Sequence, residues 1–183
     1  VHLVSQQSVG PTLGKESLEK SLFAGWIGLA LVGLFMIAYY RLSGFIAVLA
    51  LLFYGMLNLG VYRVFGVTIT IAGIAGLVLS LGMAVDANVL IFERLREERK
   101  AGRDLRAAAE EGFKRAWTAI RDGNLTTLIA TVVLYSFSSS FVKGFALTLS
   151  IGVILSMFSA CVVTRAYLRW FHQFEKLRKD VLY

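Results

Sequence analysis

The stretch that decides the fold runs from Val64 to Glu98 and reads VFGVTITIAGIAGLVLSLGMAVDANVLIFERLREE. It holds 22 uncharged residues, then Asp86, then six more uncharged residues, and it ends in a highly charged segment. A helix of about 20 apolar residues crosses the ~30 Å hydrocarbon core of a bilayer. The stretch also lacks the period-two alternation of a membrane strand. It therefore predicts a transmembrane helix over residues 66–92 that continues beyond the membrane.

Four other uncharged runs of 20 or 21 residues predict further spans at about 21–40, 43–62, 123–142 and 144–166. Hydrophobic residues make up 57% of the 183 residues, and charged residues only 17%. A soluble domain of this size could not bury so much apolar surface in one core. The sequence thus predicts an all-α membrane protein with five transmembrane helices at 21–171. An external or interfacial segment at 1–20 precedes them, and a cytoplasmic tail at 172–183 follows.

Lysine and arginine indicate the orientation of these spans. With five spans, residues 93–122, Arg41 and the segment from 165 onward lie on one side and carry 15 positive residues, against four on the other side. The positive-inside rule places the richer side in the cytoplasm and the N-terminus outside. The net charge of +7 would also suit a nucleic-acid binder. Basic clusters that flank apolar spans more commonly set orientation, so we expect no nucleic-acid partner.

The long cytoplasmic segment 93–122 predicts two helical parts. The third span is expected to continue to about Lys100, with Gly102 as its stop, and Asp104 is a plausible N-cap for a second helix. That second helix places apolar residues at helical spacing, namely Leu105, Ala108, Ala109, Phe113, Ala116 and Ile120. We favour an amphipathic helix that lies along the membrane surface, and a docking surface for a cytoplasmic partner is the alternative.

Asp86 is the residue of the third span with the clearest chemical meaning. An ionised carboxylate costs several kcal/mol in hydrocarbon, so the group either stays protonated or faces water or a cationic partner inside a bundle. At 100° per residue, Asp86 shares a face with Ala75, Leu79, Gly82, Leu90 and Glu93, whereas Asn88 lies about 200° away. The plainer interpretation is an aspartate that only hydrogen-bonds a neighbouring helix.

The fourth span carries a polar stripe through its whole length, formed by Asn124, Thr127, Thr131, Tyr135 and Ser138. We expect Asn124, Thr127 and Thr131 to face the helix that carries Asp86 and to form a seam that water can enter. Ordinary hydroxyl packing is the alternative, since such groups also bond their own helix carbonyls. No Gly-rich phosphate loop, paired catalytic carboxylates or Ser/His/Asp set is evident, and Cys161 is the single cysteine. We therefore expect neither an enzyme nor a bound cofactor or metal.

Three motifs carry a resemblance to a known family. Gly82–Glu98 resembles the SecD signature of the SecD/SecF family of bacterial protein-export membrane proteins, which belongs to the resistance-nodulation-division superfamily. Residues 122–129 (DGNLTTLI) are similar to the second signature of that family, and residues 8–14 to the segment that joins its external domain to the membrane. Together the motifs reach over nearly the whole chain.

The resemblance implies half of a twelve-helix membrane domain, here without the first helix of that half. It implies a SecF-like partner half, fused or separate, and work beside SecYEG in the bacterial plasma (inner) membrane. The proton gradient would supply the energy for translocation. The exported polypeptide would bind an external domain that should precede Val1.

The resemblance also implies roles for particular residues. Asp86 matches the intramembrane acid that binds and releases the transported proton, and Asn88 matches by motif position. Asp122, Asn124, Thr126 and Thr127 would organise the cytoplasmic mouth of the path. Gly82 and Gly123 would permit close approach and bending. A drug- or lipid-exporting relative and a non-conducting scaffold are the alternative functions.

We expect the chain to pair with its partner half through small residues, because lipid supplies no hydrophobic force between helices. The third span offers Ala72, Ala75, Gly76 and Gly82 for such contacts, and the fifth offers Gly144, Gly152, Ser156 and Ala160.

Overall fold

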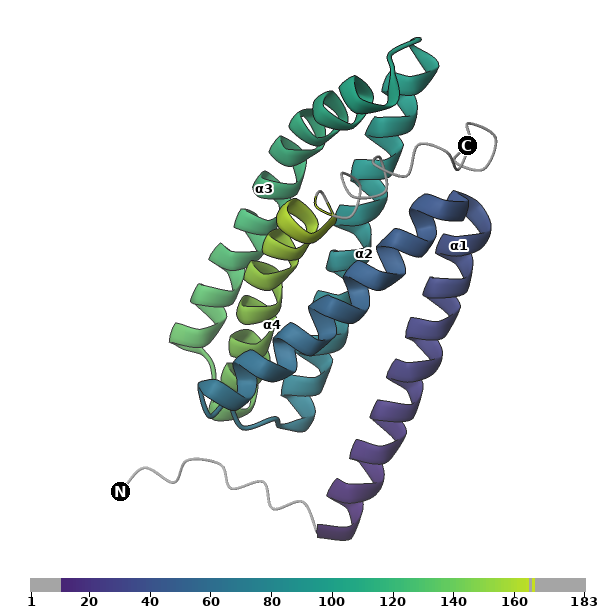
Figure 1. Ribbon diagram of the computed structural model, residues 1–183. Helices are drawn as coiled ribbons and strands as arrows, with labels where there is room; N and C mark the ends of the chain where they lie inside the picture. Colours follow the sequence, from purple (N-terminus) through teal and green to yellow (C-terminus); the bar gives the residue numbers. More distant parts are fainter. Residues whose placement is uncertain (1–10, 165, 167–183) are drawn as a thin grey trace.

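The computed structural model describes residues 11–164 and 166, and the described part is helical throughout, without a strand (Figure 1). The helices are α1 (Pro11–Val64), α2 (Ile71–Lys100), α3 (Leu105–Phe137), α4 (Ser140–Phe158) and the short π-helix η1 (Ser159–Thr164). The predicted all-α class is thereby confirmed. The predictions for the first ten residues and for the tail at 172–183 fall on residues outside this described part.

The long α1 is two helices joined by a sharp turn at Arg41, where φ is 50° and ψ is −119°. The turn falls between the first two predicted spans, as expected. The two halves fold back at this turn and separate toward the opposite end of the molecule (Figure 1). A Cβ atom on Gly44 would collide with the Met36 carbonyl group, so the turn requires glycine there. In the most apolar stretch of the first half of α1, only 6% of the residues are buried inside the described chain.

Helix α2 begins at Ile71, five residues later than the sequence pattern predicted. The delay has a local cause, since Thr70 is the N-cap and its Oγ1 accepts a hydrogen bond of 3.0 Å from the Gly73 amide. Gly66, with φ of 62°, turns the chain before this cap.

The α2–α3 turn forms as the sequence predicts. Helix α2 ends at Lys100, Gly102 adopts φ of 87°, and Asp104 caps α3 by accepting a hydrogen bond of 2.9 Å from the Ala107 amide. Helix α3 then differs from the expectation, because it continues without a break from Leu105 to Phe137. The expected cytoplasmic helix and the expected fourth span are therefore one element. The following turn lies at residues 138–139, and Lys143 is already inside α4.

Side chains lock this hairpin together. Leu95 of α2 and Phe113, Ala116 and Ile120 of α3 belong to one buried cluster. Glu98, whose side chain is only 6% exposed, accepts a hydrogen bond of 2.5 Å from Arg115 and lies 3.1 Å from Arg103. The same carboxylate raises the pKa of the Arg115 guanidinium above its usual value. The hairpin is thus a packed unit. We call the ion pairs of Glu98 with Arg103 and Arg115 its ionic clasp.

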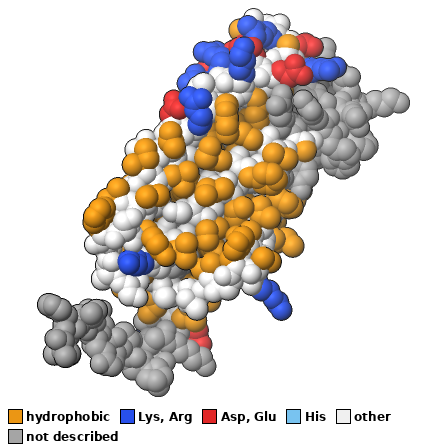
Figure 2. Space-filling model, turned by 90° about the vertical axis from the view of Figure 1, so that its left-hand side faces the viewer, with side chains coloured by type: hydrophobic (Ala, Val, Ile, Leu, Met, Phe, Trp, Pro, Cys, Tyr) orange, Lys and Arg blue, Asp and Glu red, His pale blue; other side chains and the backbone are white. Residues whose placement is uncertain are grey.

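Four helical segments of the described chain are long and apolar enough to cross a membrane, at 16–41, 43–64, 71–100 and 140–162. They agree with the predicted first, second, third and fifth spans. The middle of the molecule shows broad hydrophobic surface, while Lys, Arg, Asp and Glu gather at the end formed by the α2–α3 hairpin (Figure 2). Helix α3 is not among these four segments, although it lies beside α2 and α4 (Figure 1).

Helices α2 and α4 pack through glycine and polar groups. A Cβ atom on Gly76 would meet Thr148, and one on Gly152 would meet Ser80. At the second contact the Tyr54 hydroxyl of α1 donates 2.7 Å to Ser80 Oγ and lies 3.2 Å from the Gly152 carbonyl. Because Gly76 and Gly152 serve contacts within the chain, they do not supply the expected surface for a partner half.

Candidate functional site

Asp86 lies on an exposed face of α2. Ala75, Leu79 and Gly82 occupy the same face, and all four residues are exposed in the described chain, Leu79 by 51%. A Cβ atom on Gly82 would meet no heavy atom within 4 Å. The shared face predicted from helical periodicity is therefore present, and no described helix covers it. We call the surface of Ala75, Leu79, Gly82 and Asp86 the open face of α2.

The opposite face of α2 is buried. It includes Gly76, Ser80, Ala84 and Asn88, which pack against α4 and against both halves of α1. Helix α2 thus has a buried side and an exposed side, and Asp86 is on the exposed side. Asp86 is therefore exposed in the described chain, while the opposite face of the same helix is buried.

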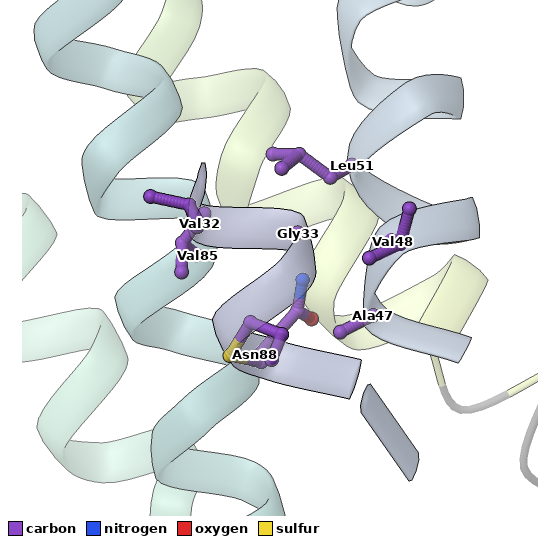
Figure 3. Close-up of a pocket in the computed structure, with 8 residues that line it drawn as sticks. Val32, Gly33, Ala47, Val48, Leu51, Val85 and Asn88 are labelled. Carbon is purple, nitrogen blue, oxygen red and sulfur yellow. The ribbon is translucent and has the colours of Figure 1, made fainter. Parts of the chain in front are cut away.

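Asn88 points away from Asp86, as its angular position predicts. Its side chain is buried and lines a small cavity between α2 and the two halves of α1 (Figure 3). The cavity offers about 10 Å³ for the centre of a water molecule, which is near the minimum for one water. Gly33, Ala47 and Val48 lie on its α1 side. Asn88 is therefore part of the α1–α2 contact and does not share a surface with the acid.

The second motif lies on α3, where most of its polar groups are bonded locally. The Asp122 side chain is 62% exposed and accepts a hydrogen bond of 2.9 Å from Arg121. The hydroxyls of Thr126 and Thr127 donate to the carbonyl groups of Asp122 and Gly123 in their own helix. Asn124 is buried, whereas a Cβ atom on Gly123 would meet no heavy atom within 4 Å.

Thr131 belongs to the contact between α3 and α4. Its Oγ1 accepts a hydrogen bond of 2.7 Å from Ser150 of α4 and donates 2.9 Å to the Leu128 carbonyl. The sequence pattern did not indicate this contact with α4. The seam between Asn124, Thr127 and Thr131 and the helix of Asp86 stays a prediction.

The charged end of α2 holds a contact that sequence reasoning missed. The Tyr40 hydroxyl donates 2.9 Å to Glu93 Oε1, and the Arg96 guanidinium lies 5.7 Å from the centre of the Tyr39 ring. The helical wheel places Glu93 on the face of Asp86, but only the fold-back of α1 at Arg41 brings the two tyrosines to it. No local pattern in the sequence signals that meeting.

The arrangement suits proton binding better than covalent chemistry. Asp86 is a titratable carboxyl group in the apolar part of a membrane helix, on a surface that another helix or water could reach. Within residues 11–164 and 166, no three His, Cys, Asp or Glu side chains are grouped so that they could hold a metal ion.

Comparison with known proteins identifies the family of the chain. The family described as protein export membrane protein SecD/SecF, C-terminal, matches residues 1–174. The protein translocase subunit SecD of Prochlorococcus marinus is 49% identical over 179 residues, which cover 98% of this chain and 36% of that protein. The SecD subunit of Synechocystis is 54% identical over 168 residues, which cover 92% of this chain and 36% of that protein. The chain thus spans about a third of these relatives.

A solved structure has the same fold. The crystal structure of SecDF from Thermus thermophilus, described as a translocon-associated membrane protein, superposes with a TM-score of 0.90 at 42% identity. The match covers 93% of this chain and 24% of that one. The apolar helices and the family together indicate a multi-pass membrane protein. It belongs to the SecD/SecF family of protein export membrane proteins, with SecD subunits as its relatives.

Proposed function

We propose that this chain is the membrane part of a SecD-type subunit that uses the proton gradient to assist the export of proteins. The observation that carries the proposal is the place of Asp86, a carboxyl group in the apolar part of α2 on a face that no described helix covers. Buried or intramembrane acids are rare and costly, and they commonly mark ion pathways. Asp86 would bind a proton from one side of the membrane and release it to the other.

A partner half would cover the open face of α2. The face combines Ala75 and Gly82, which allow another helix to approach closely, with a carboxyl group that needs water or a polar neighbour. The solved relative carries SecD and SecF together in its name, which supports a SecF-like half as the occupant. Proton uptake would then take place at the interface between the two halves, in the manner of resistance-nodulation-division transporters.

We further propose that α3 also crosses the membrane, which gives five spans. It runs antiparallel to α2 and beside α4 from the charged end of the molecule to the opposite end (Figure 1). The excess of Lys and Arg in the α2–α3 hairpin would place that hairpin in the cytoplasm of a bacterium, and the N-terminus outside its inner membrane. The solved relative is described as translocon-associated, which supports work beside the SecYEG channel on an exported polypeptide.

The test replaces Asp86 by asparagine in the full-length protein with its partner half. Asparagine keeps the size and hydrogen bonding of the side chain but cannot release a proton. In membrane vesicles that import a secretory protein, Asp86→Asn should abolish the stimulation by a proton gradient and leave the rate without a gradient unchanged. Asp86→Glu keeps a carboxyl group and should retain part of the stimulation. Wild-type stimulation in Asp86→Asn vesicles would instead identify a scaffold that does not conduct protons.

A further inference from the structure

We propose that Glu93 is a second proton-binding group, which passes the proton between Asp86 and the cytoplasm. The inference rests on the proposed function and identifies the next group that binds the proton on its way past Asp86. It is carried by the position of Glu93 on α2 together with its contact to α1.

The two carboxyl groups lie on one side of α2. Seven residues separate them, which corresponds to a rotation of about 20° and a rise of about 10 Å along the helix. Leu90 lies between them and is half-buried. A proton cannot cross ~10 Å directly, since each transfer needs a hydrogen-bonded neighbour within about 3 Å. A short chain of water molecules along the open face of α2 would connect the two groups.

The Glu93 side chain is fixed in place and still reaches water. Its Oε1 accepts the 2.9 Å hydrogen bond from Tyr40, and the Tyr40 ring packs 6.0 Å from that of Phe92. The side chain remains 38% exposed, and the Arg96 guanidinium lies 3.9 Å from the carboxylate. A group that exchanges protons with the cytoplasm needs this combination of a defined position and access to water.

Other acids near the charged end are less suited to the same role. Glu97 lies on the same face one turn further out, where it is 48% exposed and paired with Arg94 at 2.6 Å. Glu98 is held by two arginines in the ionic clasp between α2 and α3. Asp122 is on α3, paired with Arg121. Glu93 is thus the first acid on the open side of α2 beyond Asp86.

The transfer is balanced in protons and charge. A protonated Asp86 gives its proton to a bound water, a proton passes along the water chain to the Glu93 carboxylate, and Asp86 is left ionised. Glu93 then releases the proton to cytoplasmic water. Among the titratable or charged groups of the described residues, Tyr40 from α1 and Arg96 from α2 contact Glu93, and Tyr39 from α1 contacts Arg96. Tyr40 acts as a positioning residue, since its hydroxyl holds the carboxylate in place.

The experiment uses the full-length protein with its partner half in liposomes that contain a pH-sensitive dye. Glu93→Gln keeps an oxygen that can accept the Tyr40 hydrogen bond but removes the titratable group. We expect gradient-driven proton entry to fall by about a hundredfold, a typical contribution of a positioned acid–base group. Glu93→Asp should retain most of the flux. Added imidazole, which carries protons to the mouth of the path, should restore flux in Glu93→Gln and not in Asp86→Asn.

The control is Glu97→Gln, which removes the same charge from the same face one turn further out and should conduct like the wild type. Wild-type flux in Glu93→Gln would overturn the proposal, and lost flux in Tyr40→Phe beside it would show that Glu93 is only an acceptor for the tyrosine. Loss of flux that imidazole does not restore would also overturn it. These results concern Glu93 alone if Asp86→Asn is inactive, whereas an active Asp86→Asn refutes the proposed function itself.

Discussion

Gly76 and Gly82 show how a single methyl group can distinguish the two sides of α2. The side of Gly76 is packed against α4, where an added Cβ atom would meet the Thr148 hydroxyl and approach the Phe145 carbonyl. The side of Gly82 is open, and an added Cβ atom would meet nothing within 4 Å. Both residues lie in the same helix, so the difference between them comes from packing and not from backbone conformation.

We expect Gly76→Ala to destabilise the chain by about 1–3 kcal/mol relative to Gly82→Ala, since extra volume in a close contact forces a local shift. Gly82→Ala should leave the stability of this chain unchanged or slightly higher, because alanine favours helix more than glycine. Thermal unfolding of the two purified variants in the same detergent measures the difference. Equal stabilities would show that α2 and α4 are not in close contact at Gly76.

At the scale of elements, the α2–α3 hairpin extends beyond the predicted membrane boundary as one packed pair. A Cβ atom on Gly112 would lie 2.8 Å from the Leu95 amide nitrogen, so the two helices approach closely without side chains between them at that point. Glu98 closes the outer end through Arg103 and Arg115. The pair can therefore transmit a displacement of α2 to α3 as a unit.

We expect Glu98→Ala to reduce the stability of this hairpin by about 1–2 kcal/mol, less than for a fully buried ion pair because both arginines are about half exposed. Glu97→Ala, which removes an exposed pair with Arg94, should cost less than about 0.5 kcal/mol. Protection of the residue 105–115 amides against hydrogen exchange reports the local effect. Similar exchange rates in the two variants would contradict the role of the clasp.

The sequence predicted those elements whose ends are set by local chemistry. Gly102 follows the end of α2 with a positive φ, and the Asp104 side chain caps the start of α3. Both roles were predicted correctly from the sequence. The uninterrupted α3 was missed because charge marks a membrane boundary and does not mark a helix end. The partner of Thr131 was missed for a different reason. Periodicity places a hydroxyl on a face, but only the packing of three helices decides which neighbour that face meets.

At the scale of the whole molecule, α2 is buried on one side and exposed on the other. One side contacts α1, α3 and α4, and the other presents Asp86 beside exposed apolar side chains. The chain amounts to about a third of its SecD relatives. The open face of α2 is the surface that the proposed partner half would cover.

Orientation and the fifth span can be tested together with two single-cysteine variants in a Cys161→Ser background. Ala101→Cys lies in the α2–α3 turn and Ser139→Cys in the α3–α4 turn, and both positions are exposed. An impermeant maleimide added to intact cells should label position 139 and not position 101, because five spans place these turns on opposite sides. Labelling of both from one side would show that α3 does not cross the membrane.

The hydrogen bond between Thr131 and Ser150 has a consequence for biosynthesis. The ribosome completes α3 before α4, and at that moment an α3 that crosses the membrane, as proposed above, would place a threonine and an asparagine among lipid tails without their later neighbours. Helix α3 is not among the helices that are long and apolar enough to cross a membrane, so its entry into the bilayer on its own would be unfavourable. Once α4 follows across the two-residue turn, the serine and threonine satisfy each other. We therefore expect α3 and α4 to enter the bilayer jointly as a hairpin, whereas the first half of α1, which contacts little of the chain, can enter by itself.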